Sequence, residues 1–210
     1  MKLQKIGGYA SIVNAFLCAI FLVFLLLVLP RLGLVGPSDW IDPVKGIAAS
    51  IASHVTFFLL NLVYILWSIA FILIVLSLRE RMEASAPNLM WIAVIGVSIS
   101  CALWLATGLI GIVGMPSSAS ANDASAYRAG MGVYLGLSNA GDHAAGWALL
   151  LIGWAAVKTR LLPRILSYFL ILNGIVGILE FVALPLGFVV LLLSIVWSLW
   201  LGVVLLRSKA

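Results

Sequence analysis

Residues 138–164 read SNAGDHAAGWALLLIGWAAVKTRLLPR. It opens with the polar residues Asn139, Asp142 and His143, continues through an apolar segment of helical length, and ends in a basic turn around Pro163. The basic end indicates how the segment is oriented in a membrane. The polar start is the densest ionisable cluster beside a hydrophobic segment in the sequence, so any chemistry is expected to begin there.

The composition excludes an ordinary soluble globular protein. Of the 210 residues, 64% are hydrophobic and only 9% are charged, whereas about a quarter of the residues of soluble domains are charged. The mean hydropathy is +1.24. Lys2 and Lys5 precede a long apolar run, as in a signal peptide, but the run over 6–30 is longer than a signal-peptide core and no cleavage site follows it. We therefore expect this run to be a retained first membrane span.

Apolar runs of roughly 20 residues alternate with short breaks that contain proline, glycine or charged residues. This pattern predicts an all-α integral membrane bundle of six transmembrane helices in one domain, residues 1–210. A loop punctuated by glycine and proline is expected after the first span. Residues 127–138 are expected either to lie on the surface or to extend the fourth span. The predicted spans are 6–30, 52–78, 89–113, 138–157, 165–184 and 188–206.

The basic residues predict the orientation of the bundle. Six spans place both termini on one side, and nine of the twelve Lys and Arg residues fall at the helix ends on that side. These nine are Lys2, Lys5, Arg79, Arg81, Lys158, Arg160, Arg164, Arg207 and Lys209, and the other three are Arg31, Lys45 and Arg128. The bias predicts cytoplasmic termini in a plasma (inner) membrane. The net charge of +5 is thus an orientation signal, and the lipid bilayer rather than nucleic acid is the expected partner.

Two carboxylates are predicted at one depth in the bundle. Asp142 lies sixteen positions before Lys158, and Glu180 lies sixteen positions after Arg164. At about 1.5 Å of rise per residue, each carboxylate lies roughly 24 Å from the cytoplasmic boundary of a core about 30 Å thick.

Asn61 and His54 extend this outward-facing polar layer. Asn61 precedes Arg79 by eighteen positions, which is roughly 27 Å along a helix, and His54 lies a turn or two further out. His143 adjoins Asp142 in sequence but points about 100° away around the helix. The candidate layer is composed of His54, Asn61, Asp142, His143 and Glu180.

An ionised acid near hydrocarbon costs on the order of 2 to 3 kcal/mol or more unless it is paired or hydrated, so both carboxylates are functional candidates. Each also has a structural alternative. Asp142 follows Asn139 and Gly141 closely enough to help cap a helix N-terminus. Glu180 lies near a helix C-terminus, where the helix dipole disfavours an anion, and a structural hydrogen bond is its alternative.

The two histidines raise the question of a metal or haem site. His54 and His143 are ligand types for zinc, but the sequence holds no H-E-x-x-H spacing and no C-x-x-C-H attachment motif. They are therefore only weak metal candidates, an interfacial role is the alternative, and the sequence assigns no cofactor.

Other residues have a structural interpretation beside a functional one. Asn14 and Asn173 lie at one depth and could hydrogen-bond each other across the bundle as interhelical glue. Trp147 and Trp154 are seven apart on one helix face, where they line either an apolar ligand cavity or a packed core. Glycine stripes predict close helix approach and docking faces. They comprise Gly108, Gly111 and Gly114, and Gly132 with Gly136.

The C-terminal half resembles a known family. The run GDHAAGWALLLIGWAA at 141–156, the turn LLPR at 161–164, and a last helix with Trp197, Trp200 and Gly202 are similar to a bacterial multi-pass membrane family classed as a domain of unknown function, the type numbered 4386. The resemblance implies a multi-pass membrane protein. It supplies no established reaction, cofactor or functional residue.

Three functions are compatible with these residues. The favoured one is a membrane protein that binds, or transports, a small or lipidic molecule in an outward-facing pocket, with Asn61, Asp142, His143, Trp147 and Glu180 as the predicted ligand-binding residues. The second is an intramembrane enzyme that uses Asp142 and Glu180 as acid and base or as metal ligands. The third is a structural subunit of a homo-oligomer or a larger membrane complex. Binding is favoured because polar groups cluster on one side while no catalytic spacing motif occurs.

Overall fold

The computed structural model describes residues 3–182 and 185–208, and this part of the chain is all-helical, as predicted. Residues 183–184 of the predicted fifth span, with Lys2 and Lys209, lie outside the described residues. The elements are α1 (Leu3–Val23), η1 (Phe24–Val28), α2 (Leu29–Arg31), α3 (Pro37–Ile41), α4 (Pro43–Ala52), α5 (His54–Met82), α6 (Pro87–Leu109), η2 (Ile110–Gly114), α7 (Met115–Ser120), α8 (Ala124–Thr159), α9 (Arg164–Leu179), η3 (Glu180–Val182) and α10 (Pro185–Arg207).

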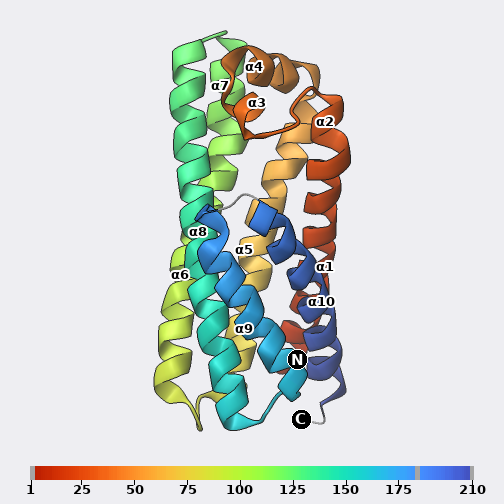
Figure 1. The fold of residues 1–210 in the computed structure, drawn as a ribbon, viewed down its shortest axis with the longest axis vertical. Coiled ribbons are helices and arrows are strands. Elements are labelled where there is room, and N and C mark those ends of the chain that lie inside the picture. Colours follow the sequence, from red (N-terminus) through yellow and green to blue (C-terminus); the bar gives the residue numbers. More distant parts are fainter. Residues whose placement is uncertain (1–2, 183–184, 209–210) are drawn as a thin grey trace.

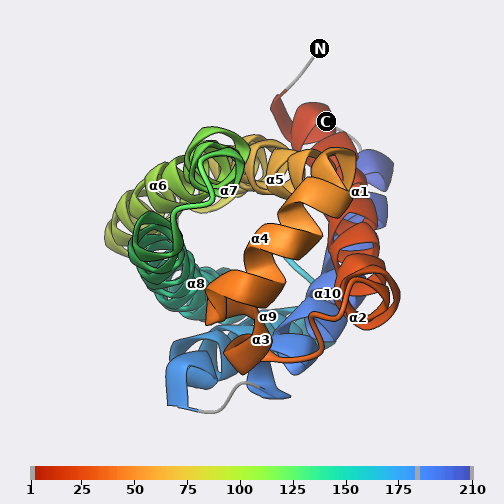
Figure 2. The same ribbon diagram turned by 90° about the horizontal axis from the view of Figure 1, so that it is seen from above.

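Within the described residues, six long helices form a closed ring in chain order (Figures 1 and 2). Helix α1 packs on α5, α5 on α6, α6 on α8, α8 on α9, α9 on α10, and α10 returns to α1. Five helical stretches of the described chain are long and apolar enough to cross a membrane. They are Leu3–Arg31, His54–Met82, Pro87–Ser120, Arg164–Val182 and Leu186–Arg207.

The remaining ring helix, α8, differs from these five in composition. Its 36 residues span about 54 Å, well beyond the roughly 30 Å of a hydrocarbon core. The predicted range 138–157 is therefore only its second half, and residues 127–138 continue the same helix. Asp142 and His143 lower the hydropathy of that apolar half, which separates α8 from the other ring helices.

Two prolines explain the two π-helical segments. A proline inside a helix lacks the amide proton and its ring clashes with the carbonyl four residues earlier. Pro30 follows η1 and Pro116 follows η2, and at each place the backbone widens so that Leu29 N donates to Phe24 O and Met115 N donates to Ile110 O. The chain therefore stays helical from Leu3 to Arg31 and from Pro87 to Ser120.

Helices α3 and α4 replace the irregular loop expected after the first span. Each begins with a proline at its first position, where a missing amide costs nothing. Asp42 caps α4 by accepting a hydrogen bond from Val44 N. Seen from above in Figure 2, α4 runs across the end of the ring. It packs on α7, α8 and α5, so it covers the interior of the bundle at that end.

The interior is solid at the opposite end, where both termini lie (Figure 1). Many of the large, fully buried side chains lie there, in the C-terminal halves of α5, α8 and α10 and at the starts of α6 and α9. They include Ile74, Met82, Met90, Ile152, Leu166 and Leu205. Helices α9 and α10 meet well short of the end that α3 and α4 cover (Figure 1). Space inside the bundle is therefore found in the half nearer α4.

The two buried asparagines do not pair with each other as predicted, because α10 supplies a serine to each. Asn14 Nδ2 donates to Ser198 Oγ at 2.8 Å, and Asn173 contacts Ser194 Oγ at 2.9 Å. Ser194 and Ser198 are one helical turn apart on α10, which packs against both α1 and α9. The amides therefore act as glue through a shared neighbour helix.

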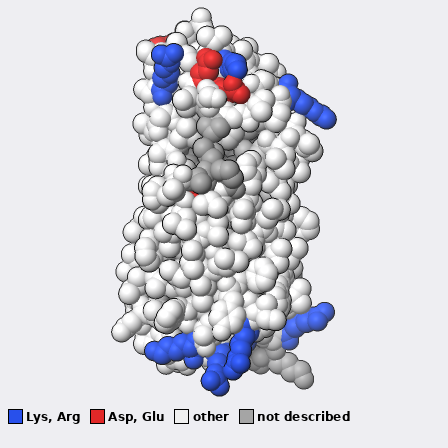
Figure 3. All heavy atoms as spheres, viewed as in Figure 1, with Lys and Arg blue, Asp and Glu red and all other residues white. Residues whose placement is uncertain are grey.

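Nearly all charged side chains on the face seen in Figure 3 lie at the two ends of the molecule, with a wall between them that is almost entirely uncharged. Most side chains of that wall are large and apolar, and they stay exposed along the outer faces of the ring helices. Such a band is what a hydrocarbon environment requires of a helical bundle.

Candidate functional site

A cavity of about 250 Å³ lies inside the ring, below α3 and α4. Its wall is mainly aliphatic and aromatic, and is built from α1, α5, α8 and α10 together with the covering helices. The aromatic part of the wall comprises Phe21, Trp40, Phe57, Tyr64, Trp67 and Tyr134, among others. The polar part includes Asn61, Asp142 and Glu180, so the structure brings together three of the residues that the sequence singled out.

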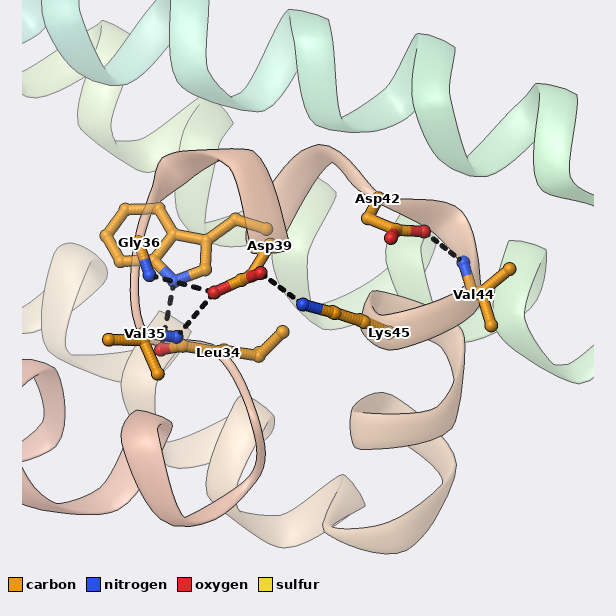
Figure 4. A network of polar contacts seen from close by, with 8 residues as sticks. Leu34, Val35, Gly36, Asp39, Asp42, Val44 and Lys45 are labelled. Atoms are coloured by element: carbon orange, nitrogen blue, oxygen red, sulfur yellow. Dashed lines mark hydrogen bonds and ion pairs between the residues drawn. The ribbon is translucent and has the colours of Figure 1, made fainter.

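The cover over the cavity is held by a network around Asp39 (Figure 4). Asp39 Oδ2 accepts hydrogen bonds from Val35 N at 3.0 Å and from Gly36 N at 3.2 Å, and Asp39 Oδ1 pairs with Lys45 Nζ at 2.5 Å. The Lys45 ammonium and these amides lower the pKa of Asp39 below its usual value, so the carboxylate remains ionised at neutral pH. The network positions Trp40, whose side chain lines the cavity below.

Helix α4 packs closely against α8 at Gly46. A Cβ atom at Gly46 would meet the phenol group of Tyr127, so only glycine leaves room for this ring. The Tyr127 hydroxyl donates to the carbonyl of Trp40 at 3.4 Å. Tyr127 is buried and lines the cavity with Ser50 of α4. The outer half of α8 thus joins the cover to the wall.

Asp142 is held in place by donors from two directions. Trp104 Nε1 on α6 donates to Asp142 Oδ1 at 3.0 Å, and Ser138 Oγ, one turn earlier on α8, donates to Oδ2 at 3.5 Å. Ser138 also shares a hydrogen bond of 3.1 Å with the hydroxyl of Tyr64. Gly141 makes the arrangement feasible, because a Cβ atom there would lie 2.7 Å from the Trp104 ring. Asp142 lies in mid-helix, so it does not cap α8; Asp123 does.

Glu180 reaches the same cavity from the turn after α9. Helix α9 ends at Leu179, and Glu180 begins the single 3₁₀ turn η3. A Cβ atom at Gly187 would lie 2.5 Å from Glu180 Oε1, so the first turn of α10 makes room for this carboxylate. Asp142 and Glu180 lie close enough to repel each other electrostatically when both are ionised. The sequence prediction that they share one level is consistent with this placement.

Asn61 presents a buried acceptor at the cavity wall. Its side chain is 2% exposed, and Nδ2 donates to Phe57 O at 2.7 Å. Oδ1 has no hydrogen-bond partner among the described residues. Gly111 lies against this amide, since a Cβ atom there would overlap Asn61 Oδ1. Two members of the predicted glycine stripe, Gly108 and Gly111, therefore bring η2 and the end of α6 close to α5 around Asn61.

The predicted site residues His143 and Trp147 lie outside the cavity lining. His143 Nδ1 contacts the carbonyl of Ile178 at 3.2 Å, and Trp147 Nε1 donates to His143 Nε2 at 3.1 Å. These contacts place the proton of the neutral imidazole on Nδ1. The Trp147 side chain is 49% exposed and that of Trp154 is 61% exposed, so this tryptophan face points to the lipid side and not to a ligand or a core. The reason is helical phase, because both positions are rotated away from Asp142 around α8.

His54 also does not take part in the site. It is exposed at the start of α5 and does not line the cavity. Among the described residues, no group of three or more His, Cys, Asp or Glu side chains is arranged to hold a metal ion. The geometry thus gives no support to the weak metal candidates His54 and His143.

The site is also shaped by aromatic residues that no sequence pattern singled out as ligand-binding. Trp67 stacks on Trp104 with centroids 5.3 Å apart, which links the cavity wall to the indole that binds Asp142. Tyr64 makes edge contacts with Phe21 at 5.4 Å and with Tyr134 at 6.0 Å. A signal for the tyrosines was present, because a phenol within an apolar span needs a hydrogen-bond partner.

A second, smaller cavity of about 30 Å³ lies on the other side of Asp142. Its lining includes Asn14, Asn173 and Ser194, the polar layer that joins α1, α9 and α10. A space of this size can hold a water molecule when polar partners line it. Asp142 therefore stands between the large cavity and a deeper polar layer.

Comparison of the chain with protein families, with curated proteins and with solved structures finds no match. The interpretation of the site therefore depends on its geometry and chemistry.

Proposed function

We propose that this chain is a six-span plasma-membrane protein that binds a small or lipidic molecule in the cavity below α3 and α4. In this proposal α8 is the sixth span, both termini are cytoplasmic, and the cover formed by α3 and α4 faces outward. The uneven distribution of Lys and Arg between the two ends of the bundle supports this orientation.

The single observation that carries the binding proposal is the cavity itself. Ligand pockets are concave, mostly apolar, and contain a few convergent polar groups. The cavity of about 250 Å³ has an aromatic and aliphatic wall with Asn61, Asp142 and Glu180 set into it. A cavity of about 150 Å³ is enough to take up benzene, so this one can accept a molecule larger than a single ring.

A substitution that fills the cavity without touching the polar residues tests the proposal. Leu135 lines the cavity from α8, whereas Val133, two residues earlier on α8, is 53% exposed and does not line it. We expect native mass spectrometry of the protein, released from lipid nanodiscs, to show a bound molecule on the wild type and on Val133→Trp. The adduct should be lost or strongly reduced on Leu135→Trp, because the new indole occupies its space.

Two results would contradict the proposal. One is an adduct of the same mass and occupancy on Leu135→Trp, which would place the molecule elsewhere. The other is a wild-type protein that carries no molecule and binds none from a lipid extract of its host membrane. Elemental analysis of the same samples addresses the enzyme alternative in which Asp142 and Glu180 hold a metal, since a metal that disappears in Glu180→Gln would favour it.

The alternative of a structural subunit depended on glycine-rich helix faces to which another protein chain could bind. Several glycine contacts are used inside the chain instead, as at Gly8 with Gly202 between α1 and α10 and at Gly146 with Gly174 between α8 and α9. Gly132 and Gly136 have no atom within 4 Å of a Cβ position among the described residues. Among the predicted glycine faces, the one on the outer half of α8 is therefore open for a second copy or another subunit.

A further inference from the structure

We infer that the cavity is selective for organic cations, that is, molecules with an apolar or aromatic body and a protonated amine. This inference rests on the proposed binding function and adds the chemical class of the ligand. Three independent features of the cavity support it: the sign of its charged groups, an unpaired acceptor, and the aromatic wall around the carboxylates.

The charged groups that line the cavity are all acidic. Asp142 and Glu180 are in the lining, and none of the described lining residues is Lys, Arg or His. An anionic ligand would therefore meet two carboxylates and no counter-charge. A cation between the carboxylates would instead relieve their mutual repulsion in a medium of low polarity. The negative charge of the lining thus favours cationic over anionic ligands, whatever their shape.

The hydrogen-bonding groups of the wall also require a donor. Asn61 lines the cavity, and its buried Oδ1, which faces Gly111, has no hydrogen-bond partner among the described residues. A buried acceptor without a partner costs about 1 to 3 kcal/mol. An ammonium group has three donors and no acceptor, so it can satisfy Asn61 and a carboxylate together. A cationic ligand beside Asn61 would supply the hydrogen bond that this acceptor lacks.

The aromatic residues supply the third feature. Tyr64, Trp67 and Phe21 form a contiguous group in the wall, with Phe21 5.4 Å from Tyr64 and 5.8 Å from Trp67. Tyr64 and Trp67 connect to Asp142 through Ser138 and Trp104. Aromatic faces attract cations, and aromatic cages are a known way to recognise ammonium groups. The same wall buries the apolar body of a ligand, which a hydrated metal ion would not use.

Three probes that share one body test the inference. They are 2-phenylethylammonium, the neutral 2-phenylethanol and the anionic 3-phenylpropanoate. Binding to the full chain in nanodiscs at pH 7 is measured by isothermal titration calorimetry, with empty nanodiscs as the control for partition into lipid. At this pH the amine is protonated, as an alkyl ammonium with a pKa near that of lysine. We expect the ammonium probe to bind about tenfold or more tightly than the alcohol, since charge-assisted hydrogen bonds exceed neutral ones by that order.

Substitutions identify the groups responsible. Asp142→Asn and Glu180→Gln should each reduce the preference for the cation over the alcohol about tenfold, while binding of the alcohol changes little. Glu83→Gln is the matched control. Glu83 is also a carboxylate, but it pairs with Arg79 at 2.7 Å near the end with the termini and does not line the cavity. This variant should keep the wild-type preference. Thermal unfolding of each variant checks that it is folded. If Asp142→Asn does not fold, the result for Glu180→Gln decides.

The outcomes separate this inference from the proposed function. If the alcohol binds as tightly as the ammonium probe, or if the preference survives both substitutions, the cation inference is wrong and the binding function stands. If the anion binds most tightly, the inference is wrong in sign. If none of the three probes binds to the folded protein although native mass spectrometry shows a bound molecule, the cation inference is wrong and the binding function stands; if no molecule is found by either method, both are wrong.

Discussion

Asn61 shows how a single residue of the cavity links stability to binding. Its Oδ1 atom is buried without a partner among the described residues, and this costs folding free energy. Leucine has nearly the same shape and no polar atom. We therefore predict that Asn61→Leu raises the stability of the ligand-free protein by about 1 kcal/mol and weakens binding of the ammonium probe. Thermal unfolding and calorimetry on the same samples measure both effects.

Ser100 provides the matched control for this prediction. Its Oγ atom is also buried without a partner among the described residues, but it lies on α6 and does not line the cavity. Ser100→Ala should therefore be neutral or stabilising and leave the affinity for the probe unchanged. If Asn61→Leu binds the probe as tightly as the wild type does, Asn61 is only a structural residue.

The sequence indicated the depth of a residue along its helix, but it did not indicate the angle of the residue around that helix. Counting from the basic helix ends brought Asn61, Asp142 and Glu180 to one level, and all three line one cavity. His143 lies at the depth of Asp142 and Trp147 about one turn further along α8, but both point at other angles and contact each other instead. Helix α8 packs against two neighbouring helices and is also apolar on its outer side, so its sequence shows no single hydrophobic stripe. The sequence therefore did not indicate which side of α8 faces the cavity.

Among the elements, the α8–α9 pair is the most closely packed at the backbone. A Cβ atom at Gly174 would lie 2.5 Å from Leu150 N and 2.7 Å from Gly146 O, and neither backbone atom can move without shifting a helix. We predict that Gly174→Ala destabilises the protein by about 1 to 3 kcal/mol, as overpacking does in dense interiors. The change in melting temperature measured in nanodiscs checks this.

Gly136 supplies the comparison for Gly174. It also lies within a helix, but a Cβ atom there has no neighbour within 4 Å among the described residues. Gly136→Ala should be neutral or stabilising by up to about 1 kcal/mol, because alanine loses less backbone entropy in a helix. A Gly136→Ala protein as unstable as Gly174→Ala would show that this face of α8 is covered by another molecule.

The sequence predicted the long helices better than the short ones. A run of about twenty apolar residues has few possible structures other than a membrane-spanning helix. Helices α3 and α4 are only 5 and 10 residues long and show no clear hydrophobic period. The signal for α4 was the pairing of Asp42 with Pro43, a cap followed by a first-turn proline. Glycine spacing was also ambiguous. Gly132 and Gly136 match the spacing of a helix-docking pattern but contact no other helix among the described residues, whereas Gly146 packs against the backbone of α9.

For the whole molecule, the decisive property is its orientation in the membrane. Ser120 is exposed at the end of α7, beside the cover over the cavity, and Ser85 is exposed in the turn between α5 and α6 at the opposite end. Cys18 and Cys101 are buried, so they provide little background for thiol labelling. We predict that a membrane-impermeant maleimide labels Ser120→Cys on intact cells and labels Ser85→Cys only after permeabilisation. The reverse pattern would place the cavity on the cytoplasmic side.

The basic residues at the helix ends predict an orientation, which stays a prediction, but the arrangement of the helices could not be predicted from one sequence. Nothing in the spacing of apolar residues indicates that α10 returns to α1, because the contact depends on which small residues of the two helices meet. Gly8 and Gly202 make this contact, and each lies in a stretch with the composition of any lipid-facing segment. A ring with a hollow half was therefore not predicted, although the polar groups that face the hollow were.

The order of the ring has a consequence for how the protein is made. Each long helix contacts the one synthesised just before it, and only the pairing of α10 with α1 joins the two ends of the chain. When the ribosome has delivered everything up to Glu180, both acids are in the membrane but the wall from Gly187 to Leu191 is missing. Until the last helix is inserted, these carboxylates must be hydrated or must contact polar groups of the insertion machinery. Chains that stop before α10 should therefore be recognised and degraded by membrane quality control.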